Sequence, residues 1–289
     1  MSRPRPRRVV WLDGRVLPAS RARVSVFDRG LLYGDAAFET VRVYRGKPFR
    51  WREHRKRLAT TLKRLAIPFP RTDLRRAIDE VLEAARLTEA AVRLTITRGV
   101  GEGLAPSAKL DPTLLLIPRP VPAGLEDARI NGVSVIRLPF GQGRHGFTTG
   151  HKTTDYAAAV QGRILAARAD AFEALYVEED GSLSEATTSN VFVVKRGRLL
   201  TPPVTAGCLP GITREVVLQI AEKEGLPTRE QVLQAGPLED ADEIVLTGSV
   251  IEVMPVVRLD DSPVGTGAPG PVTTLLQRAF RRRVAAALK

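Results

Sequence analysis

The stretch Gly150-His151-Lys152-Thr153-Thr154-Asp155-Tyr156 lies near the middle of the chain and places one lysine among small polar residues. A glycine-rich segment, residues 139–150, leads into it, and a helical pattern leads out of it from Ala157. A desolvated lysine is a nucleophile that traps carbonyl groups. A lysine before a helix is more often an ordinary surface residue, so the rest of the chain has to decide between the two interpretations.

The chain is long enough for two domains with a substantial core, since it has 289 residues, of which 43% are hydrophobic and 26% charged. A single cysteine, Cys208, excludes an internal disulfide. No apolar run long enough for a signal peptide follows the basic start, and no stretch approaches the length of a membrane span. We therefore expect a soluble cytoplasmic protein.

The net charge is +12, because 44 Lys and Arg residues stand against 32 Asp and Glu residues. Such a charge raises the hypothesis of nucleic-acid binding. The basic residues cluster at 3–8, 50–64 and 281–283 with few aromatic residues among them, so platforms for base stacking are scarce. We interpret most of the charge as solvated helix faces and expect no nucleic-acid partner; a nucleic-acid-binding protein remains the remote alternative.

Alternating and periodic patterns predict the elements of the first half of the chain. Residues 9–12 and 15–17 read as a hairpin with Asp13 and Gly14 at its turn. Strands are also predicted at 24–28, 37–44, 91–97 and 113–117, and helices from about Trp51 and from an N-cap at Thr72.

The composition changes after residue 118, where Pro118, Pro120 and Pro122 predict a stiff connector and a domain boundary. Strands are predicted at 133–138, 172–177, 190–194 paired with 198–201, and 243–246, and helices from the lysine stretch to about 169, at 213–224 and at 271–288. The predicted fold is mixed α+β in two domains. These are a small N-terminal domain at 1–118, a connector with one strand at 119–149 and a larger C-terminal domain at 150–289.

Two features of the second half suit a phosphate group. A helix that starts at Gly211, Ile212 and Thr213 presents free backbone N–H groups and a hydroxyl. Residues 247–249, at the end of a strand, could do the same as a turn. Each feature taken alone is more often an ordinary cap or turn.

Three other motifs fail. Residues 146–153 are close to a P-loop, but His151 stands where the loop needs a glycine before its lysine. Residues 101–104 lack the third glycine of a dinucleotide-binding fingerprint. The three histidines and Cys208 show no metal-ligand spacing, so we expect no metal.

Two further blocks accompany the lysine stretch: residues 184–192 (SEATTSNVF) and residues 209–214 (LPGITR). With them the chain resembles the fold-type IV pyridoxal-phosphate enzymes, the class IV aminotransferases. This family includes branched-chain aminotransferases, D-amino-acid aminotransferases and aminodeoxychorismate lyases. The resemblance follows the family's order through residues 24–30, 33–39, 53–58 and 248–256. It implies a two-domain α+β enzyme with the cofactor between the domains.

The resemblance implies a role for each matching residue. Lys152 corresponds to the lysine that binds pyridoxal 5'-phosphate covalently and moves a proton during catalysis. Glu185 would pair with the pyridine nitrogen. Tyr156 would bond the phenolic oxygen, and its offset of four would place it on one helix face with Lys152 if the helix has begun there. The phosphate would be bound by Arg57, Ile212, Thr213 and Ser249.

The choice of substrate stays open at this stage. The D-amino-acid and lyase branches usually carry an arginine in the loop after residues 97–99. Here the loop at 99–106 has Gly103 near that position and looks like the Gly-x-Gly turn of the branched-chain branch. Residues 38–43 and 151–153 look more like the other two branches. The substrate contacts that the resemblance implies are Tyr33, Phe38, Arg93, Arg98 and Val250.

We therefore expect transamination of an apolar, branched-chain-like amino acid with 2-oxoglutarate as the acceptor. The alternatives are an aminodeoxychorismate lyase, which eliminates pyruvate to give 4-aminobenzoate, and a D-amino-acid aminotransferase. The L or D stereochemistry stays open, because one loop contact can reverse which carboxylate pocket is used. The expected partners are a small amino acid and a 2-oxo acid, with no membrane, and the resemblance implies a homodimer.

Overall fold

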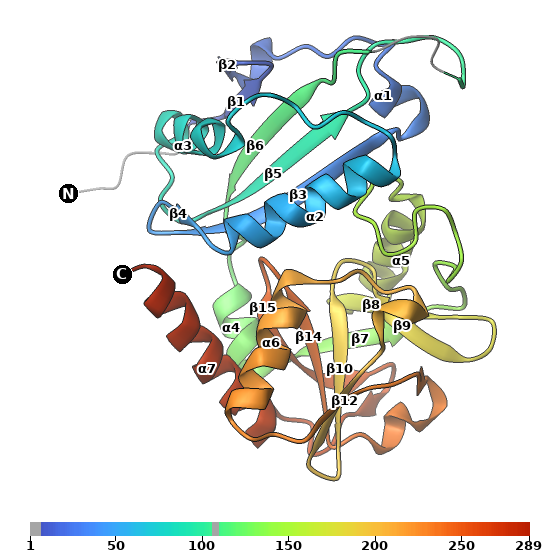
Figure 1. Ribbon diagram of the computed structural model, residues 1–289. Coiled ribbons are helices and arrows are strands. Elements are labelled where there is room, and N and C mark those ends of the chain that lie inside the picture. Colours follow the sequence, from blue (N-terminus) through green and yellow to red (C-terminus); the bar gives the residue numbers. More distant parts are fainter. Residues whose placement is uncertain (1–6, 106–109) are drawn as a thin grey trace. The chain divides into compact units, whose positions relative to one another are not determined.

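The computed structural model describes residues 7–105 and 110–289, which form two compact units (Figure 1). The N-terminal unit comprises the described residues up to Val121 with His151–Asp155 and Leu288, and the C-terminal unit comprises Pro122–Gly150, Tyr156–Ala287 and Lys289. This division separates Lys152 from Tyr156 and so differs from the predicted ranges 1–118, 119–149 and 150–289. Residues 3–6 of the basic start and Pro106 of the glycine-rich loop lie outside the described residues.

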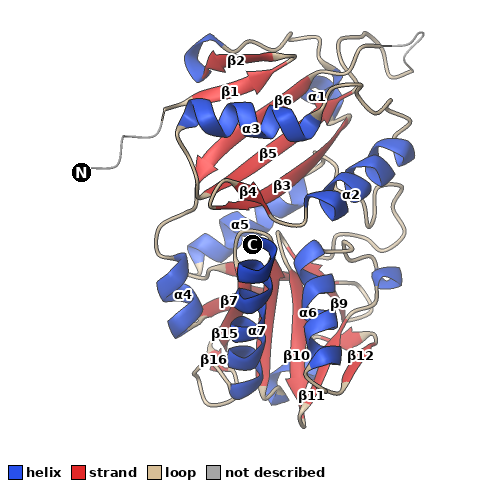
Figure 2. Ribbon diagram, turned by 60° about the vertical axis from the view of Figure 1, so that its left-hand side comes forward, coloured by secondary structure: helices blue, strands red, loops and turns tan. Residues whose placement is uncertain are grey.

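The N-terminal unit is built on a six-stranded antiparallel sheet (Figures 1 and 2). Its strand order is β2 (Arg15–Pro18), β1 (Val9–Leu12), β6 (Leu114–Pro120), β5 (Ala90–Thr97), β3 (Ala36–Tyr44) and β4 (Lys47–Pro48). The hairpin of β1 and β2 confirms the turn predicted at Asp13 and Gly14.

The helices α2 (Trp51–Arg64) and α3 (Leu74–Ala85) cover one face of this sheet (Figure 2). Strand β5 alternates strictly, so that Ala90, Val92, Leu94 and Ile96 are buried against the helices. Burial of such an apolar face is the main driving force for the unit. The intervening residues of β5, including Arg93, point to the other face of the sheet.

The C-terminal unit holds a mixed ten-stranded sheet (Figure 2). Nine strands follow the order β12 (Thr228–Glu230), β11 (Arg198–Thr201), β10 (Asn190–Lys195), β14 (Glu243–Gly248), β15 (Glu252–Leu259), β7 (Val133–Arg137), β8 (Glu173–Val177), β9 (Ser182–Ala186) and β13 (Leu233–Gln234). The tenth, β16 (Ser262–Pro263), pairs with β15. The antiparallel pair of β10 and β11 was predicted and is confirmed.

Four helices pack in the C-terminal unit: α4 (Leu125–Asn131), α5 (Ala157–Arg168), α6 (Ile212–Lys223) and α7 (Pro271–Ala287). Helix α6 packs on α7 and on β14, and α5 packs on β8. The start of α7 is fixed by Glu243, whose carboxylate accepts hydrogen bonds from Val272 N at 2.9 Å and Thr273 N at 2.7 Å. A carboxylate at this position accepts hydrogen bonds from first-turn N–H groups, which have no acceptor within the helix itself.

The prediction of a strand at 24–28 is wrong. Residues 26 and 27 form a turn, and Asp28 makes a single bridge with Val100. The Asp28 carboxylate accepts a hydrogen bond from Gly30 N at 2.8 Å and thereby caps α1 (Arg29–Tyr33). A side chain that caps the following helix ends the extended backbone there. The N-cap of α3 is likewise one residue later than predicted, at Asp73 instead of Thr72.

The predicted proline connector is wrong in its first part, because β6 continues to Pro120. Pro118 pairs with Val92 of β5, whereas β1 pairs with β6 earlier, at Leu115 and Leu116. Pro118 and Pro120 therefore lie in the part of β6 that pairs with β5 but no longer with β1. An edge of this kind tolerates a residue without a backbone N–H group. The elements α4, β9 and β15 have no counterpart among the predicted ones.

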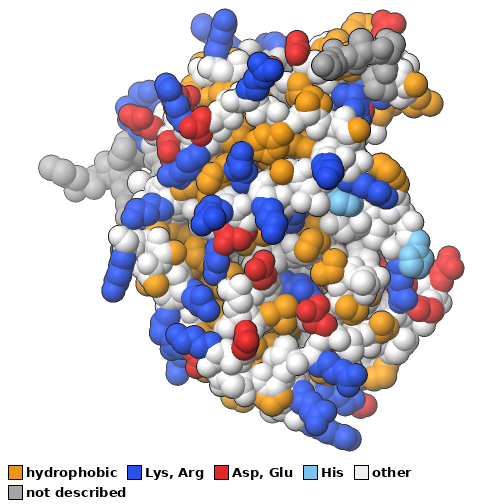
Figure 3. All heavy atoms as spheres, in the orientation of Figure 1, with side chains coloured by type: hydrophobic (Ala, Val, Ile, Leu, Met, Phe, Trp, Pro, Cys, Tyr) orange, Lys and Arg blue, Asp and Glu red, His pale blue; other side chains and the backbone are white. Residues whose placement is uncertain are grey.

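Within the described residues, no helix is long and apolar enough to cross a membrane. Lys and Arg side chains are spread over the face drawn in Figure 3, with carboxylates among them. The basic side chains that this face carries are therefore distributed and do not form a single stripe.

Candidate active site

The segment around Lys152 lies beside the first half of β3. Phe38 N donates a hydrogen bond to Lys152 O at 2.9 Å, and Thr154 N donates one to Ala36 O at 3.0 Å. The bridge between Ala37 and Thr153 places Thr153 on the helix side of the sheet, where it is buried. Since side chains alternate along an extended segment, Lys152 points to the opposite side.

Helix α5 begins only at Ala157, with Tyr156 at its N-cap position. A shared helix face for Lys152 and Tyr156 was expected only if the helix had already begun there, and this condition is not met because α5 begins at Ala157. The offset of four residues therefore does not place the side chains of Lys152 and Tyr156 on one face of α5.

The Lys152 side chain meets an aromatic ring and a second cation. Its Nζ lies 4.5 Å from the centroid of the Phe38 ring, and Arg93 Cζ lies 3.7 Å from the same centroid. The register of β3 and β5 pairs Phe38 with Thr95 and Thr40 with Arg93, so both side chains share the face away from the helices. Two cations over one ring give this face the charge that attracts a carboxylate or a phosphate.

Two threonines fix the backbone of this segment. Lys152 N donates to Thr61 Oγ1 of α2 at 3.3 Å, and Thr154 Oγ1 donates to Gly34 O at 2.7 Å. Thr61 is a positioning residue that sequence reasoning did not find, because 91 residues separate it from Lys152.

Arg57, predicted to bind phosphate, belongs to a buried ion cluster on the helix side of β3. Its Nε and Nη2 each lie 2.8 Å from the carboxylate of Glu39, and His54 Nδ1 lies 2.7 Å from Glu39 Oε2. Burial opposes ionisation of Glu39, but the charges of Arg57 and His54 and their hydrogen bonds outweigh it and lower its pKa to about 2. The role of Arg57 toward a phosphate stays a prediction.

Arg98, predicted to contact substrate, supports the fold. Its guanidinium donates to Asp35 at 2.6 and 3.0 Å and to the carbonyls of Leu65 and Ala66 at the end of α2. Burial works against ionisation of Asp35, but hydrogen bonds from Arg98 and Arg29 outweigh it and hold its pKa below the ordinary value. The geometry therefore favours Arg93 over Arg98 as a substrate contact.

The glycine-rich loop is held by buried Arg29, which donates to Leu104 O at 2.9 Å and also to Gly103 O. Gly99 has a φ of +94°, and a Cβ built there would lie 1.9 Å from Asp111 O. Only glycine fits this position. The conformation of residues 99–104 is therefore fixed by the hydrogen bonds from Arg29 and by the close approach of Gly99 to the backbone of Asp111.

In the C-terminal unit, three donors orient the Glu185 carboxylate. They are Gln142 Nε2 at 3.1 Å, Asn190 Nδ2 at 3.0 Å and Leu209 N at 3.1 Å. Charge-assisted hydrogen bonds of this kind hold a carboxylate in one direction.

Asn190 joins Glu185 to the start of α6. Its Nδ2 also donates to Leu209 O at 2.9 Å, and a Cβ built on Gly211 would lie 1.9 Å from Asn190 Oδ1. Gly211 is the N-cap of α6 and makes no side-chain capping bond. The first-turn amides of α6, at Ile212 and Thr213, therefore begin beside Asn190 without a side-chain cap.

Buried hydroxyls flank the same asparagine. Thr247, which pairs with Asn190 across β10 and β14, and Ser189 have hydroxyl oxygens that are buried without a hydrogen-bond partner among the residues described. An unpaired buried hydroxyl costs free energy. Ser249 follows Thr247 by two residues, in the turn between β14 and β15. This donor set suits an anionic group, and Thr247 is a candidate ligand that the prediction omitted.

Tyr156 and Glu185 share the surroundings of Tyr176. Burial first, and then the charges of Glu185 and Glu173 with a smaller effect of Tyr156, raise the pKa of Tyr176 above its ordinary value. Burial also raises the pKa of the Cys208 thiol to about 12, which favours the protonated thiol over the nucleophilic thiolate. Val250, in the turn after β14, has its carbonyl bonded by Arg129 Nη2 at 3.2 Å.

Comparisons with known proteins agree on one family. Residues 36–259 match the family model described as amino-transferase class IV. The chain is 38% identical over 278 residues to a putative branched-chain-amino-acid aminotransferase of Methanocaldococcus jannaschii, which covers 94% of this chain and 95% of that protein. It is 32% identical to the D-alanine aminotransferase of Bacillus licheniformis, over 95% of this chain and 96% of that protein.

Solved structures give the same result. The Escherichia coli branched-chain amino acid aminotransferase superposes with a TM-score of 0.89 at 31% identity, covering 96% of this chain and 94% of that one. The 4-amino-4-deoxychorismate lyase of Pseudomonas aeruginosa superposes with a TM-score of 0.84 at 32% identity, covering 94% and 98%. The two solved structures share the fold of this chain, and the four relatives carry names of three activities.

Proposed function

This chain belongs to the class IV aminotransferase family, and on that premise we propose that it is a pyridoxal-phosphate enzyme that moves the amino group of an apolar, branched-chain-like amino acid to 2-oxoglutarate. The observation that carries the proposal is the donor set around Asn190. There an oriented carboxylate, an uncapped helix start and two unpaired buried hydroxyls occur together.

The residues of this donor set, with Tyr156 and Arg57 from elsewhere in the chain, would hold the cofactor. Glu185 would bond the pyridine nitrogen and favour its protonated form. The phosphate would be bound by the amides and hydroxyl at Ile212 and Thr213, by Ser249 and by Thr247. Tyr156 would donate to the phenolic oxygen, and Arg57 would add a positive charge for the phosphate. When bound, pyridoxal phosphate supplies an electron sink for the substrate's α-carbon.

Lys152 would bind the cofactor covalently and carry a proton on Nζ to and from the reacting carbons. The hydrogen bonds of its backbone to Phe38 and Thr61, and the bond from Thr154 N to Ala36 O two residues on, restrict where Nζ can reach. A general base acts efficiently when its proton-transfer distance is fixed in this way.

The face that carries Phe38 and Arg93 supports an amino acid with an apolar side chain. The ring offers an apolar surface, and the guanidinium offers a bidentate partner for a carboxylate. In the loop at 99–104, Gly103 stands near the position where the D-amino-acid and lyase branches usually carry an arginine. This difference favours the branched-chain activity. Tyr33 and Val250 remain predicted substrate contacts.

A lyase is the second candidate, because the chain is 32% identical to a 4-amino-4-deoxychorismate lyase over almost the full length of both chains. Such an enzyme would use the same lysine to eliminate pyruvate. The D-alanine aminotransferase relative supports a third substrate, a D-amino acid.

One substrate panel separates these candidates. We expect glutamate formation from leucine, isoleucine and valine with 2-oxoglutarate. Pyruvate release from aminodeoxychorismate without an acceptor would establish the lyase, and turnover limited to D-alanine would establish the D-amino-acid activity. No turnover of the three branched-chain amino acids would reject the proposed substrate.

We also propose that the enzyme is a homodimer. Large apolar side chains are exposed on α1, on the turn before it and on the glycine-rich loop: Val26, Phe27, Leu31, Leu32, Val100 and Leu104. The bond from Gly101 N to Phe27 O joins the turn to the loop. An apolar patch of this kind is typical of a protein interface. Light scattering should give twice the chain mass for the wild type, and Leu31→Lys should lower it toward that of the monomer.

A further inference from the structure

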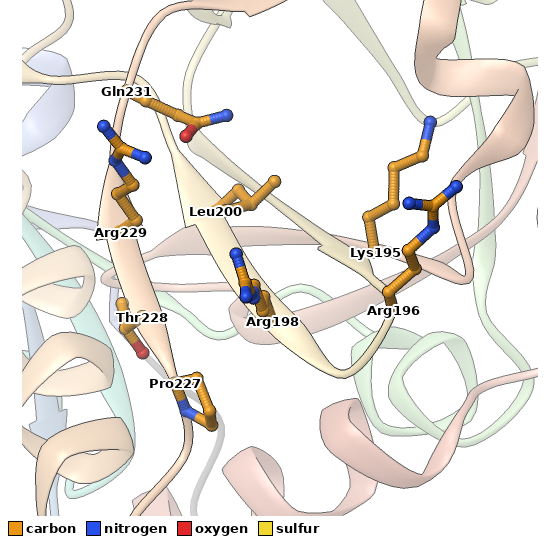
Figure 4. A pocket seen from close by; sticks show the side chains of 8 residues that line it. All are labelled: Lys195, Arg196, Arg198, Leu200, Pro227, Thr228, Arg229 and Gln231. Carbon is orange, nitrogen blue, oxygen red and sulfur yellow. The ribbon is translucent and has the colours of Figure 1, made fainter.

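A basic hollow lies at the edge of the C-terminal sheet (Figure 4). Its volume is about 710 Å³, and it is lined by Lys195, Arg196, Arg198, Leu200, Pro227, Thr228, Arg229 and Gln231. Figure 4 shows Lys195 and Arg196 on one side of the hollow and Arg229 and Gln231 on the other. Ligand sites in proteins have volumes of about 300–1,000 Å³, so the hollow is large enough for a small molecule.

The strand register brings the cations together. Lys195 of β10 pairs with Arg198 of β11, and Leu200 of β11 pairs with Arg229 of β12. Paired residues on neighbouring strands share a face, and residues two apart on one strand do as well. Lys195, Arg198 and Arg229 therefore share the outer face of the sheet, while Leu199 between them is fully buried.

Carboxylates do little to balance this charge. Within 7–105 and 110–289, Arg196, Arg198 and Arg229 make no ion pair, and Lys195 reaches Asp240 at 3.5 Å with that carboxylate mostly exposed. Glu230 of β12 is bonded to Arg214 at 2.5 Å, and Asp242 accepts from Arg196 N at 2.6 Å. Like charges directly opposite on paired strands destabilise a sheet, and a bound anion removes that cost.

The hollow is separate from the donor set around Asn190. Asn190 and Lys195 are the two ends of β10, and five residue steps of about 3.3 Å separate them by roughly 17 Å. Helix α6 starts beside Asn190 and ends at Lys223, before the chain enters β12. A phosphate bound at the start of α6 would therefore leave the hollow open.

We propose that the basic hollow binds a small oligophosphate, either inorganic polyphosphate or a nucleoside di- or triphosphate. Three guanidinium groups supply paired N–H donors that match phosphate oxygens, and Lys195 adds a point charge. Gln231 adds an amide, and Leu200 and Pro227 add apolar surface against which a nucleoside base can lie. The site would act in addition to transamination and does not depend on it.

Calorimetric titration of the protein with inorganic triphosphate tests this proposal. The protein is first loaded with pyridoxal phosphate and freed of excess, so that the start of α6 does not compete. We expect one site per chain. The double variant Arg198→Gln/Arg229→Gln should bind about tenfold or more weakly, since it removes two guanidinium groups that would bond phosphate oxygens.

A matched control carries the same loss of charge elsewhere. Arg168 and Arg278 are exposed on α5 and α7, so Arg168→Gln/Arg278→Gln should stay within about twofold of the wild type. Equal weakening in both double variants, or no binding by the wild type, would overturn the proposal. Unchanged thermal unfolding midpoints would show that both variants fold.

Two further ligands identify the source of the phosphate. Equal affinity for triphosphate and adenosine triphosphate would assign binding to the phosphates alone, and tighter binding of the nucleotide would add a base contact at Leu200 and Pro227. Both results support the site. Duplex DNA that binds more tightly than triphosphate, with the same loss in the Arg198/Arg229 variant, would replace the proposal with a nucleic-acid surface.

Discussion

Two glutamates, one in each unit, are held in opposite ways. Glu39 is fully buried and bonded to the cationic Arg57 and to His54. Three of the groups that bond Glu185 are neutral donors, namely Gln142, Asn190 and the backbone amide of Leu209. Cationic partners cancel a buried charge, whereas neutral donors direct a carboxylate and leave its charge in place. The first arrangement neutralises a buried charge, and the second would suit a cationic ligand such as the pyridinium ring proposed for Glu185.

The largest effect that tests this comparison is expected at Glu39. Glu39→Gln removes the charge but keeps the shape, which takes away the carboxylate that buried Arg57 and His54 both bond. Breaking a buried ion pair from one side costs about 3–5 kcal/mol, so the free energy of unfolding should fall by that amount. Urea unfolding measures it. A loss no greater than that of an exposed control such as Glu179→Gln would show that the cluster does not stabilise the unit.

Glu185→Gln should lower catalytic activity far more than it lowers stability. Because Gln142, Asn190 and the Leu209 amide carry no charge that would be left unbalanced, stability should change less than in Glu39→Gln, while kcat should fall about 10²–10³-fold through the lost electrostatic stabilisation. Unfolding curves and kcat should be measured for the Glu39 and Glu185 variants together, so that the loss of stability and the loss of activity can be compared directly. A Glu185→Gln enzyme with wild-type kcat would contradict the proposed role of Glu185.

Acid unfolding should carry the signature of Glu39. The pKa of Glu39 is lowered in the folded state from 4.5 to about 2, so its contribution to stability is present above pH 4.5. That contribution is lost as the pH falls through 4.5 toward 2, and it amounts to about 3 kcal/mol. Glu39→Gln should flatten the pH dependence of stability in this window, whereas Glu185→Gln should keep most of it.

Asn190 should give the smallest of these effects, since it acts through Glu185 and Gly211. Asn190→Ala should weaken pyridoxal-phosphate binding by about 10–100-fold, the range for residues that orient a ligand-binding group. A purely structural role would lower stability and leave cofactor affinity unchanged. Asn190→Ser, which keeps one donor, should recover part of the affinity.

The sequence allowed prediction of much of the fold because strong local patterns decide it. The hairpin at 9–17, helix α2 and helix α6 each carry a clear turn or an apolar period. Helix α4 was missed because it has seven residues and buries only Leu125 and Arg129. The strand at 24–28 was predicted wrongly because its apolar residues lie on the surface and its last residue caps a helix.

The candidate site was predictable where a motif marks it and unpredictable where long-range contacts define it. Lys152 and Glu185 stand in recognisable blocks. The pairing of Arg57 with Glu39, the hydrogen bond from Lys152 to Thr61 and the use of Arg98 at the end of α2 depend on residues 18 to 91 positions apart. Local patterns carry no information about such contacts.

The proposal that Lys152 binds pyridoxal phosphate covalently can be tested directly by absorption and mass spectrometry. Protein mixed with pyridoxal phosphate and freed of excess should absorb visible light. After borohydride reduction, the peptide that contains Lys152 should carry the added mass of the cofactor, and Lys152→Ala should lack the band, the added mass and turnover. A protein that stays colourless with pyridoxal phosphate, or a Lys152→Ala variant that keeps the band and turnover, would contradict the assignment of Lys152.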